Sequence, residues 1–238
     1  MRLLKSVVLS VAACCLVQVP AVTTLRADQK TGTLDIYFID VEGGAANLIV
    51  TPEGESLLID SGYPDNQGRD LNRIIAVAGE VAGLKRIDHA MVSHWHLDHF
   101  GNHAALAAKF GVGTFWDRGI PDSLSEDPGF PDRIAAYRAA SQNQSKALQA
   151  GQLVPLKSGK TPLSLKVLCA SREAVVGEGP QNSFAARHQP QPDDPTDNSA
   201  SIAVLLRFGE FRYVTCGDLT WNMEAKLVTP RKIGRAHV

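Results

Sequence analysis

The sequence predicts a single α/β domain built on a mixed sheet. Segments rich in β-branched and aromatic residues alternate with segments whose apolar residues recur at helical spacing. The chain has 238 residues, of which 44% are hydrophobic, so it can bury one sizeable core or two small ones. Neither an internal repeat nor a domain linker interrupts the pattern.

Residues 1–27 have the features of an export signal. Two basic residues precede an apolar run over residues 7–17, which is too short to span a membrane, and small residues follow it. Cleavage is expected after Ala21 or after Ala27. The sequence "VAAC", ending at Cys14, also resembles a bacterial lipoprotein box, but Cys14 lies very early for one. We therefore expect a secreted or periplasmic protein, with lipidation as the less favoured alternative.

The first part of the domain begins with three strands. These are rich in β-branched or aliphatic residues, and they span residues 33–41, 46–51 and 55–62. Apolar residues at helical spacing then predict a helix over residues 70–84. A buried strand, a helix, a strand and a second helix are expected to follow at residues 89–93, 102–110, 112–116 and 131–150.

The second part of the domain contains an apolar strand and a hairpin. In chain order the strands span residues 163–170, 201–208 and 211–217, and a helix follows at 221–227. Residues 171–199 are rich in Gly, Pro, Asn and Gln, which indicates a functional loop or a disordered one. Cys169 and Cys216 lie in the apolar strands, where we expect buried free thiols, although export would permit a disulfide.

The sequence "SHWHLDHFGNH", residues 93–103, concentrates potential metal ligands at the end of a predicted strand. His94 and His96 can reach one metal ion, and Asp98 and His99 can reach a second. Imidazole and carboxylate are the usual ligands of zinc and also suit iron or manganese. Two such ions about 3.5–4 Å apart can share a hydroxide nucleophile. A surface histidine cluster is the alternative, and the full HxHxDH string argues against it.

This string resembles the signature of the metallo-β-lactamase fold superfamily. Two further segments, "YFIDVEGGAANLIVTPEGESLLIDSG" and "DNSASIAVLLRFGEFRYVTCGDL", are similar to the branch that includes the soluble domain of the competence protein ComEC. The resemblance covers residues 33–227. It implies an α/β fold, namely an αββα sandwich of the metallo-β-lactamase type with a dinuclear metal site. In this chain the sandwich is expected to be incomplete at its C-terminus.

The resemblance also assigns residues to roles. It places His94 and His96 on one metal and Asp98 and His99 on the other, with Asp98 also carrying a catalytic role. Asp218, in "CGDL", takes the place of the aspartate that bridges both ions. A turn-forming role is the alternative for Asp218.

Other positions are less well matched. Asp60 corresponds to an aspartate that holds a ligand histidine in its tautomer, although a turn-forming Asp before Gly is equally consistent with the sequence. Most relatives have a third histidine for the first metal where this chain has Asp197 and Asn198, and the ComEC-like branch also has Asn-Ser there. His188, in the long loop, is the candidate substitute. His89 and His103 are predicted to be structural.

Charge and the first loop argue against a DNA substrate. "DVEGGAA" retains Asp40 but lacks the acidic and amide residues of the ComEC pattern. The formal net charge of the chain is −1, and without residues 1–27 and Arg235 it has 20 basic residues against 25 acidic ones, or −5. Because DNA binding relies on clustered basic residues, nucleic acid is possible as a partner but not favoured.

We expect the domain to span residues 33–232 and to be a partial one. The final residues, 233–238 ("IGRAHV"), match what the start of a sequencing adapter encodes, so they are expected to be non-native. In that case the last histidine of the second metal is missing, and His237 does not replace it.

The favoured function is an exported metal-dependent hydrolase that uses a metal-bound hydroxide on an ester, lactone, amide or phosphodiester bond. Its cofactors would be two divalent ions, Zn²⁺ before Mn or Fe. A ComEC-like nuclease acting on DNA is one alternative, and a non-catalytic metal-binding or substrate-binding module is the other. The sequence does not identify the substrate, which could be a small molecule or a polymer. It does not determine the oligomeric state either.

Overall fold

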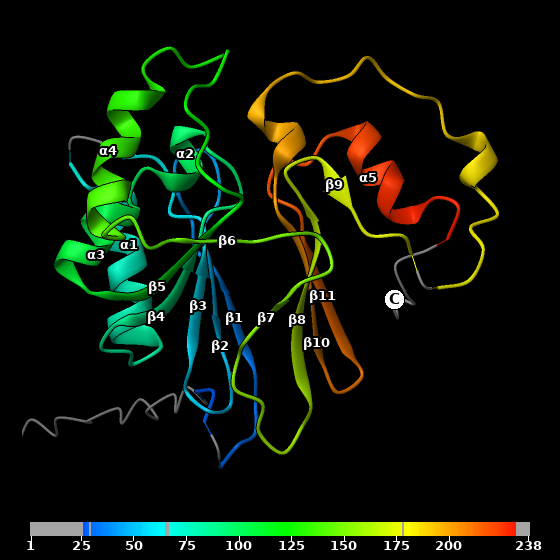
Figure 1. Cartoon of the computed structure of the whole chain (residues 1–238). Helices are drawn as coiled ribbons and strands as arrows, with labels where there is room; N and C mark the ends of the chain where they lie inside the picture. The colour runs from blue at the N-terminus through cyan, green and yellow to red at the C-terminus, as the bar shows by residue number, and fades with distance from the viewer. Residues whose placement is uncertain (1–25, 29, 65–66, 178, 232–238) are drawn as a thin grey trace, which may run out of the picture.

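Two β-sheets pack face to face, with helices on their outer faces (Figure 1). The computed structural model describes residues 26–28, 30–64, 67–177 and 179–231. This four-layer arrangement confirms the predicted αββα sandwich.

The first sheet has six strands in the order of the chain. They are β1 (Asp35–Phe38), β2 (Asn47–Val50), β3 (Ser56–Ile59), β4 (Ile87–Met91), β5 (Val112–Asp117) and β6 (Lys146–Ala147). Strands β1 to β3 are antiparallel, whereas β3 to β6 are parallel, so the sheet is mixed as predicted. The parallel strands therefore place their carboxyl ends at one edge, where α/β proteins commonly bind ligands.

Helices on one side cover the first sheet (Figure 1). They are α1 (Arg69–Ala76) with the π-helical turn η1 (Val77–Val81), α3 (His103–Lys109) and α4 (Phe130–Ala140), and the short α2 (Leu97–Phe100) follows β4. The predicted helix over residues 131–150 was wrong at its end. Gln142 and Asn143 have φ values of 54° and 55°, which a continuing helix does not allow, and the chain turns into β6.

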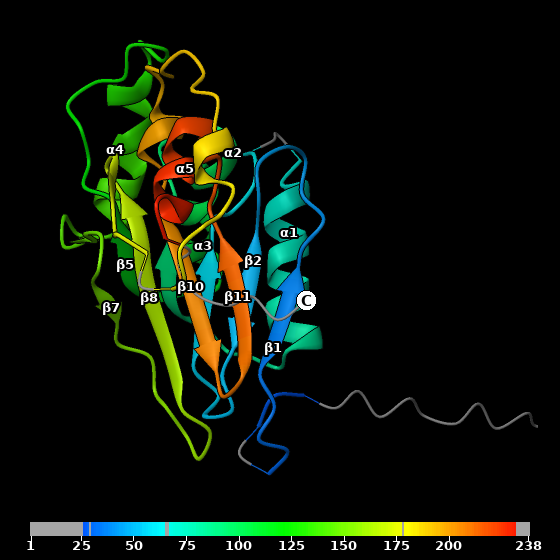
Figure 2. The ribbon, with the colours of Figure 1, turned by 90° about the vertical axis from the view of Figure 1, so that its right-hand side faces the viewer.

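The second sheet has the order β11-β10-β8-β7, with β9 paired to β8. Its strands are β7 (Leu153–Val154), β8 (Leu163–Ala170), β9 (Glu173–Ala174), β10 (Ala203–Phe208) and β11 (Phe211–Thr215). The predicted hairpin is confirmed as β10 and β11. Helix α5 (Trp221–Val228) lies on the outer face of this sheet (Figure 2). Its Met223 and Leu227 pack against buried residues of β8 and β10.

A buried apolar layer holds the two sheets together. Leu57 and Met91 from the first sheet and Leu165 and Val204 from the second are at most 1% exposed. Burying each such side chain contributes about 1.5–3 kcal/mol. The layer fixes the sheets so that the carboxyl ends of β4 and β11 lie at the same end of the sandwich (Figure 1).

Both cysteines in the described residues are free thiols. Cys169 pairs in register with Ala203 of β10, and Val204 pairs with Thr215, so β10 separates Cys169 from Cys216. Two strand spacings put the Cα atoms about 9–10 Å apart, beyond the reach of a disulfide. The expectation of free thiols is confirmed.

The predicted export signal, apart from residues 26 and 27, lies outside the described residues, as does the predicted non-native tail with His237. In the part of the chain that the structure describes, none of the helices has the length and apolar character needed to cross a membrane.

Candidate metal centre

Trp95 anchors the segment that carries the histidines. Its side chain is fully buried against Phe100, Phe130 and Tyr137, and its indole N–H donates to the carbonyl oxygen of Gly119 at 2.9 Å. Its two neighbours in sequence, His94 and His96, meet each other instead, with His94 Nε2 3.1 Å from His96 Nδ1.

Five predicted ligands form one continuous cluster. Ligand atoms of His94, His99 and Asp218 all lie within 4.8 Å of one another. His96 Nδ1 lies 3.1 Å from His94 Nε2, and Asp98 Oδ2 lies 3.8 Å from His99 Nε2. The structure thus brings together side chains separated by more than a hundred residues in sequence.

Asp60 holds His99 and the start of the histidine segment. It is 1% exposed, and its φ of 62° places a residue other than glycine in the left-handed region. Its carboxylate accepts from the backbone N–H of Ser93 at 2.7 Å and from His99 Nδ1 at 2.9 Å. His99 Nε2 is left to face the cluster, as the resemblance implied for this aspartate.

Ser93 orients His94 in the same way. Its hydroxyl donates to Asp60 Oδ2 at 2.7 Å, and its oxygen is therefore free to accept from His94 Nδ1 at 3.0 Å. This arrangement assigns the proton of His94 to Nδ1 and leaves a lone pair on Nε2. Gly217, where a Cβ would lie 2.7 Å from the Ser93 hydroxyl oxygen, packs against it and brings the neighbouring Asp218 to the cluster.

The electrostatics of the cluster favour a cation. Burial, reinforced by the neighbouring His99, lowers the pKa of His94 to about 4, so its imidazole is neutral and able to act as a ligand. Burial opposes protonation of His99, but the Asp218 carboxylate, 3.5 Å from Nε2, and the Asp60 carboxylate, bonded to Nδ1, raise its pKa to about 10. The neighbouring His99 in turn lowers the pKa of Asp218. The same carboxylates would attract a metal ion to the His99 lone pair.

The donor set fits a divalent metal. His99 Nε2 is buried and makes no hydrogen bond of good geometry among the described residues, since Asp218 Oδ1 lies 3.5 Å away, whereas its other nitrogen is bonded to Asp60. A buried polar atom without a partner costs free energy, and a bound cation would remove that cost. Imidazole nitrogens and carboxylate oxygens together are a zinc-type set.

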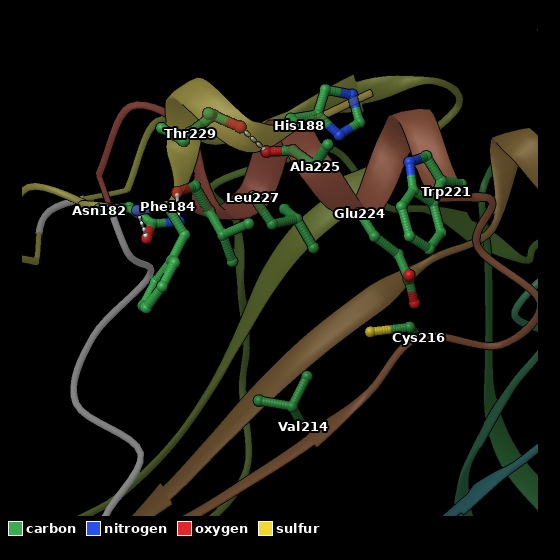
Figure 3. A pocket seen from close by; sticks show the side chains of 12 residues that line it. Asn182, Phe184, His188, Val214, Cys216, Trp221, Glu224, Ala225, Leu227 and Thr229 are labelled. Carbon is green, nitrogen blue, oxygen red and sulfur yellow. Dashed lines mark hydrogen bonds between the residues drawn. The ribbon is translucent and has the colours of Figure 1, made fainter. Parts of the chain in front are cut away.

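Asn198 follows Asp197, whose carboxylate bonds the backbone of Trp95, whereas His188 lies apart from the cluster. Asn198 is in the 3₁₀ helix η3 (Asp197–Ala200), and its buried Oδ1 lacks a partner among the described residues. His188 instead stacks on Trp221 and lines a cavity of about 490 Å³ between α5 and the 182–188 loop (Figure 3). None of the five clustered residues lines that cavity.

Sequence reasoning missed Glu126 and the bracing role of Asp197 at this end of the sandwich. Asp197 accepts from the backbone N–H of Trp95 at 2.6 Å and pairs with Arg118. Glu126 accepts from the backbone N–H of Asp197 at 2.6 Å and reaches His96 Nε2 at 3.3 Å. No local motif marks these contacts, because their partners lie 30 to 102 residues apart.

The loop at residues 40–46 contacts Asp98 through a glycine and not through an acidic side chain. A Cβ on Gly44, whose φ is 61°, would lie 1.9 Å from the carbonyl oxygen of Asp98. Asp40, retained from the ComEC pattern, is instead 81% exposed at its side chain and pairs with Arg73 and Arg69.

Neither His89 nor His103 joins the group of His94, His99 and Asp218. His89 lies 3.1 Å from Glu55 and accepts from the Trp116 indole at 3.1 Å. His103 is fully buried, with Nδ1 2.7 Å from the Ser61 hydroxyl.

Comparison with known proteins gives relatives at low identity. The chain is 26% identical over 196 residues to a protein named UPF0173 metal-dependent hydrolase from Anaeromyxobacter sp. (strain K), covering 82% of this chain and 60% of that one. The chain thus spans about 60% of the length of this curated relative.

Two solved structures are similar at lower levels of identity. The subclass B3 metallo-β-lactamase MEM-A1 from a soil metagenome library is 19% identical, with a TM-score of 0.43, over 76% of this chain and 58% of that one. BJP-1 of Bradyrhizobium japonicum, also subclass B3, is 18% identical, with a TM-score of 0.41, over 76% and 58%.

A family model extends over most of the chain. The model described as the metallo-beta-lactamase superfamily matches residues 39–236, which include the HxHxDH string and Asp218. The chain therefore belongs to the metallo-β-lactamase superfamily.

Proposed function

We propose that the protein is a metal-dependent hydrolase whose centre takes two divalent ions, zinc in preference to manganese or iron. The observation that carries this proposal is the convergence of His94, His99 and Asp218, with ligand atoms within 4.8 Å of one another. The family and the name of the Anaeromyxobacter relative support it.

The residues divide between two ions. His94 Nε2 and His96 Nδ1 would hold the first, Asp98 and His99 Nε2 the second, and Asp218 would contact both. A bound divalent ion supplies Lewis-acid chemistry and makes water acidic enough to serve as a nucleophile near neutral pH.

The chain's own groups orient the reaction. His94 and His99 are at most 1% exposed, whereas the side chains of Asp98 and Asp218 are 36% and 46% exposed. Substrate therefore approaches from the carboxylate side. The partly exposed Asp98 carboxylate would take a proton from the attacking water, which is general-base catalysis.

The bond attacked would be an ester, a lactone, an amide or a phosphodiester. A ComEC-like nuclease remains the alternative, and the formal charge of −1 for the whole chain disfavours it. Arg118, a basic residue close to the histidine segment, is already engaged by Asp197.

A substrate panel tests this proposal. The purified chain would be loaded with Zn²⁺ and assayed on p-nitrophenyl acetate, an acyl lactone, nitrocefin, bis(p-nitrophenyl) phosphate and single-stranded DNA, with and without chelator. We expect chelator-sensitive turnover of at least one small substrate, absent in His94→Ala. Ion binding without turnover of any substrate would indicate a binding module, and turnover of DNA alone would indicate the nuclease.

We also propose export to the periplasm or the outside of the cell. The support is the N-terminal sequence, in which a basic start precedes a short apolar run. Fusion of residues 1–32 to a reporter that is active only after export tests this. An inactive reporter would contradict it.

A further inference from the structure

Glu126 lies in the loop between β5 and α4 and contacts His96, one of the candidate metal ligands. Its Oε1 lies 3.3 Å from His96 Nε2, on the opposite side of the ring from the atom that faces the cluster. The Glu126 side chain is 22% exposed, and Ser125 donates to its Oε2 at 2.9 Å. The carboxylate is therefore held in place on the outer side of His96.

This contact decides which nitrogen of His96 is available. A carboxylate only accepts hydrogen bonds, so His96 must carry a proton on Nε2 to bond Glu126. The lone pair is then on Nδ1, which lies 3.1 Å from His94 Nε2. Ser93 fixes His94 with its lone pair on Nε2 as well. Two lone pairs that face each other at this distance repel unless a cation lies between them.

Glu126 also belongs to a closed circuit around the His-x-His segment. The same Oε1 accepts from the backbone N–H of Asp197 at 2.6 Å, and Asp197 accepts from the backbone N–H of Trp95 at 2.6 Å. Trp95 and His96 are neighbours in sequence. The circuit therefore fixes both the backbone before His96 and the orientation of its ring.

We propose that Glu126 is a positioning residue that holds His96 with Nδ1 directed at the first metal ion. This inference rests on the proposed function, because it requires an ion at His94 and His96. Partners that orient a ligand histidine raise its basicity and typically account for about 10- to 100-fold in metal affinity. Glu126 would act through His96 and would not touch substrate.

The test separates this role from that of a loop brace. Zn²⁺ affinity of the full 238-residue chain would be measured by competition with a chromophoric chelator for wild type, Glu126→Ala and Glu126→Gln. Glu210→Ala and Glu210→Gln, in the exposed β10–β11 turn, are the matched controls. Thermal unfolding of the metal-free proteins measures how much Glu126 contributes to stability as a loop brace. The ¹⁵N chemical shifts of His96 in the zinc-loaded proteins show which ring nitrogen carries the proton.

We expect Glu126→Ala to lose about 10- to 100-fold in zinc affinity and to show a mixed His96 tautomer. Glu126→Gln, which can still accept from both N–H groups, should lose less and keep the wild-type tautomer. The Glu210 variants should match wild type. If Glu126→Ala fails to fold, Glu126→Gln decides: a lower affinity at unchanged metal-free stability supports the proposal.

Unchanged zinc affinity and tautomer in the variants, whatever their thermal stability, would overturn the positioning role and leave Glu126 as a loop brace. Wild-type protein that binds no zinc would instead overturn the proposed function itself. The two failures are therefore distinguishable.

Discussion

The two sheets contribute to the candidate metal centre in different ways. The segment after β4 supplies four potential ligands in six residues, and its histidines are fixed by hydrogen bonds that they donate to Asp60, Ser93 and Glu126. The second sheet supplies Asp218, whose side chain is 46% exposed and whose position depends on the packing of the Gly217 turn. On the first side, hydrogen bonds hold the ligand histidines, and the two that hold His94 and His99 are buried; on the second side the ligand is a solvent-facing carboxylate.

This difference separates residues that hold the fold from residues that hold the ion. On the first-sheet side, a change should affect both the free energy of unfolding and metal affinity, because the same buried carboxylate serves both. On the second-sheet side, a change should affect metal affinity alone. The following variants test that division, from the largest expected effect to the smallest.

Replacing Asp60 by alanine should have the largest effect. The change leaves the backbone N–H of Ser93 and the His99 Nδ1 without their buried acceptor. Breaking a buried charged pair by removing one partner costs about 3–5 kcal/mol. Urea unfolding with chelator present measures the loss. Asp40→Ala, an exposed carboxylate, is the control and should stay within about 1 kcal/mol. Equal effects of the two changes would contradict the role given to Asp60.

Gly44→Ala should come next. A Cβ there would lie 1.9 Å from the Asp98 carbonyl oxygen, and the φ of 61° adds strain. Overpacking and left-handed strain together cost about 2–5 kcal/mol. Gly54→Ala, at a φ of 74° with nothing within 4 Å, should cost only the strain, about 1–2 kcal/mol. Thermal unfolding of both variants gives the comparison, and a Gly54 loss as large as that of Gly44 would rule out the contact with Asp98.

Asp218→Ala should act on metal binding and not on folding. The loss of zinc affinity should reach at least about 10- to 100-fold, the range seen for groups that merely orient ligands. The unfolding free energy of the metal-free protein should change by less than about 1 kcal/mol, because this side chain is half-exposed. Chelator competition and urea unfolding check the two parts. A large loss of metal-free stability would show that the division between the two sides is wrong.

The cysteines should give the smallest effect. Burial raises the pKa of Cys169 and of Cys216 to about 11, so at neutral pH both are protonated and react slowly. Alkylation should label neither thiol quickly in the native protein and both after unfolding, and reductant should leave the melting temperature unchanged. A pH series should raise native labelling only as the pH approaches about 11. Peptide mapping that finds a Cys169–Cys216 disulfide would contradict the strand register.

The strands and the histidine segment could be predicted because their signals are local. The apolar run at residues 163–170 coincides with β8, and HxHxDH follows β4 as expected. The predicted helix over residues 131–150 ran too long, because the left-handed conformations of Gln142 and Asn143 leave no trace in apolar periodicity.

The bracing residues could not be predicted because their partners are distant in sequence. Glu126 meets the backbone of Asp197 across 71 residues, and Asp197 meets that of Trp95 across 102. In the sequence, neither carboxylate is distinguished from other acidic residues outside the strands, because its partners are brought close only by the packing of the domain. His188 shows the converse: its residue type suited a ligand, but the fold stacks it on Trp221.

The central claim is that the residues around His94, His99 and Asp218 form a metal centre. The most direct test is zinc content by elemental analysis, after dialysis, of the wild-type chain beside His94→Ala, His99→Ala and Asp218→Ala. We expect the wild type to retain zinc and each variant to lose most of it, while Glu210→Ala retains the wild-type amount. A wild-type chain without zinc, or variants that retain as much zinc as wild type, would contradict the claim.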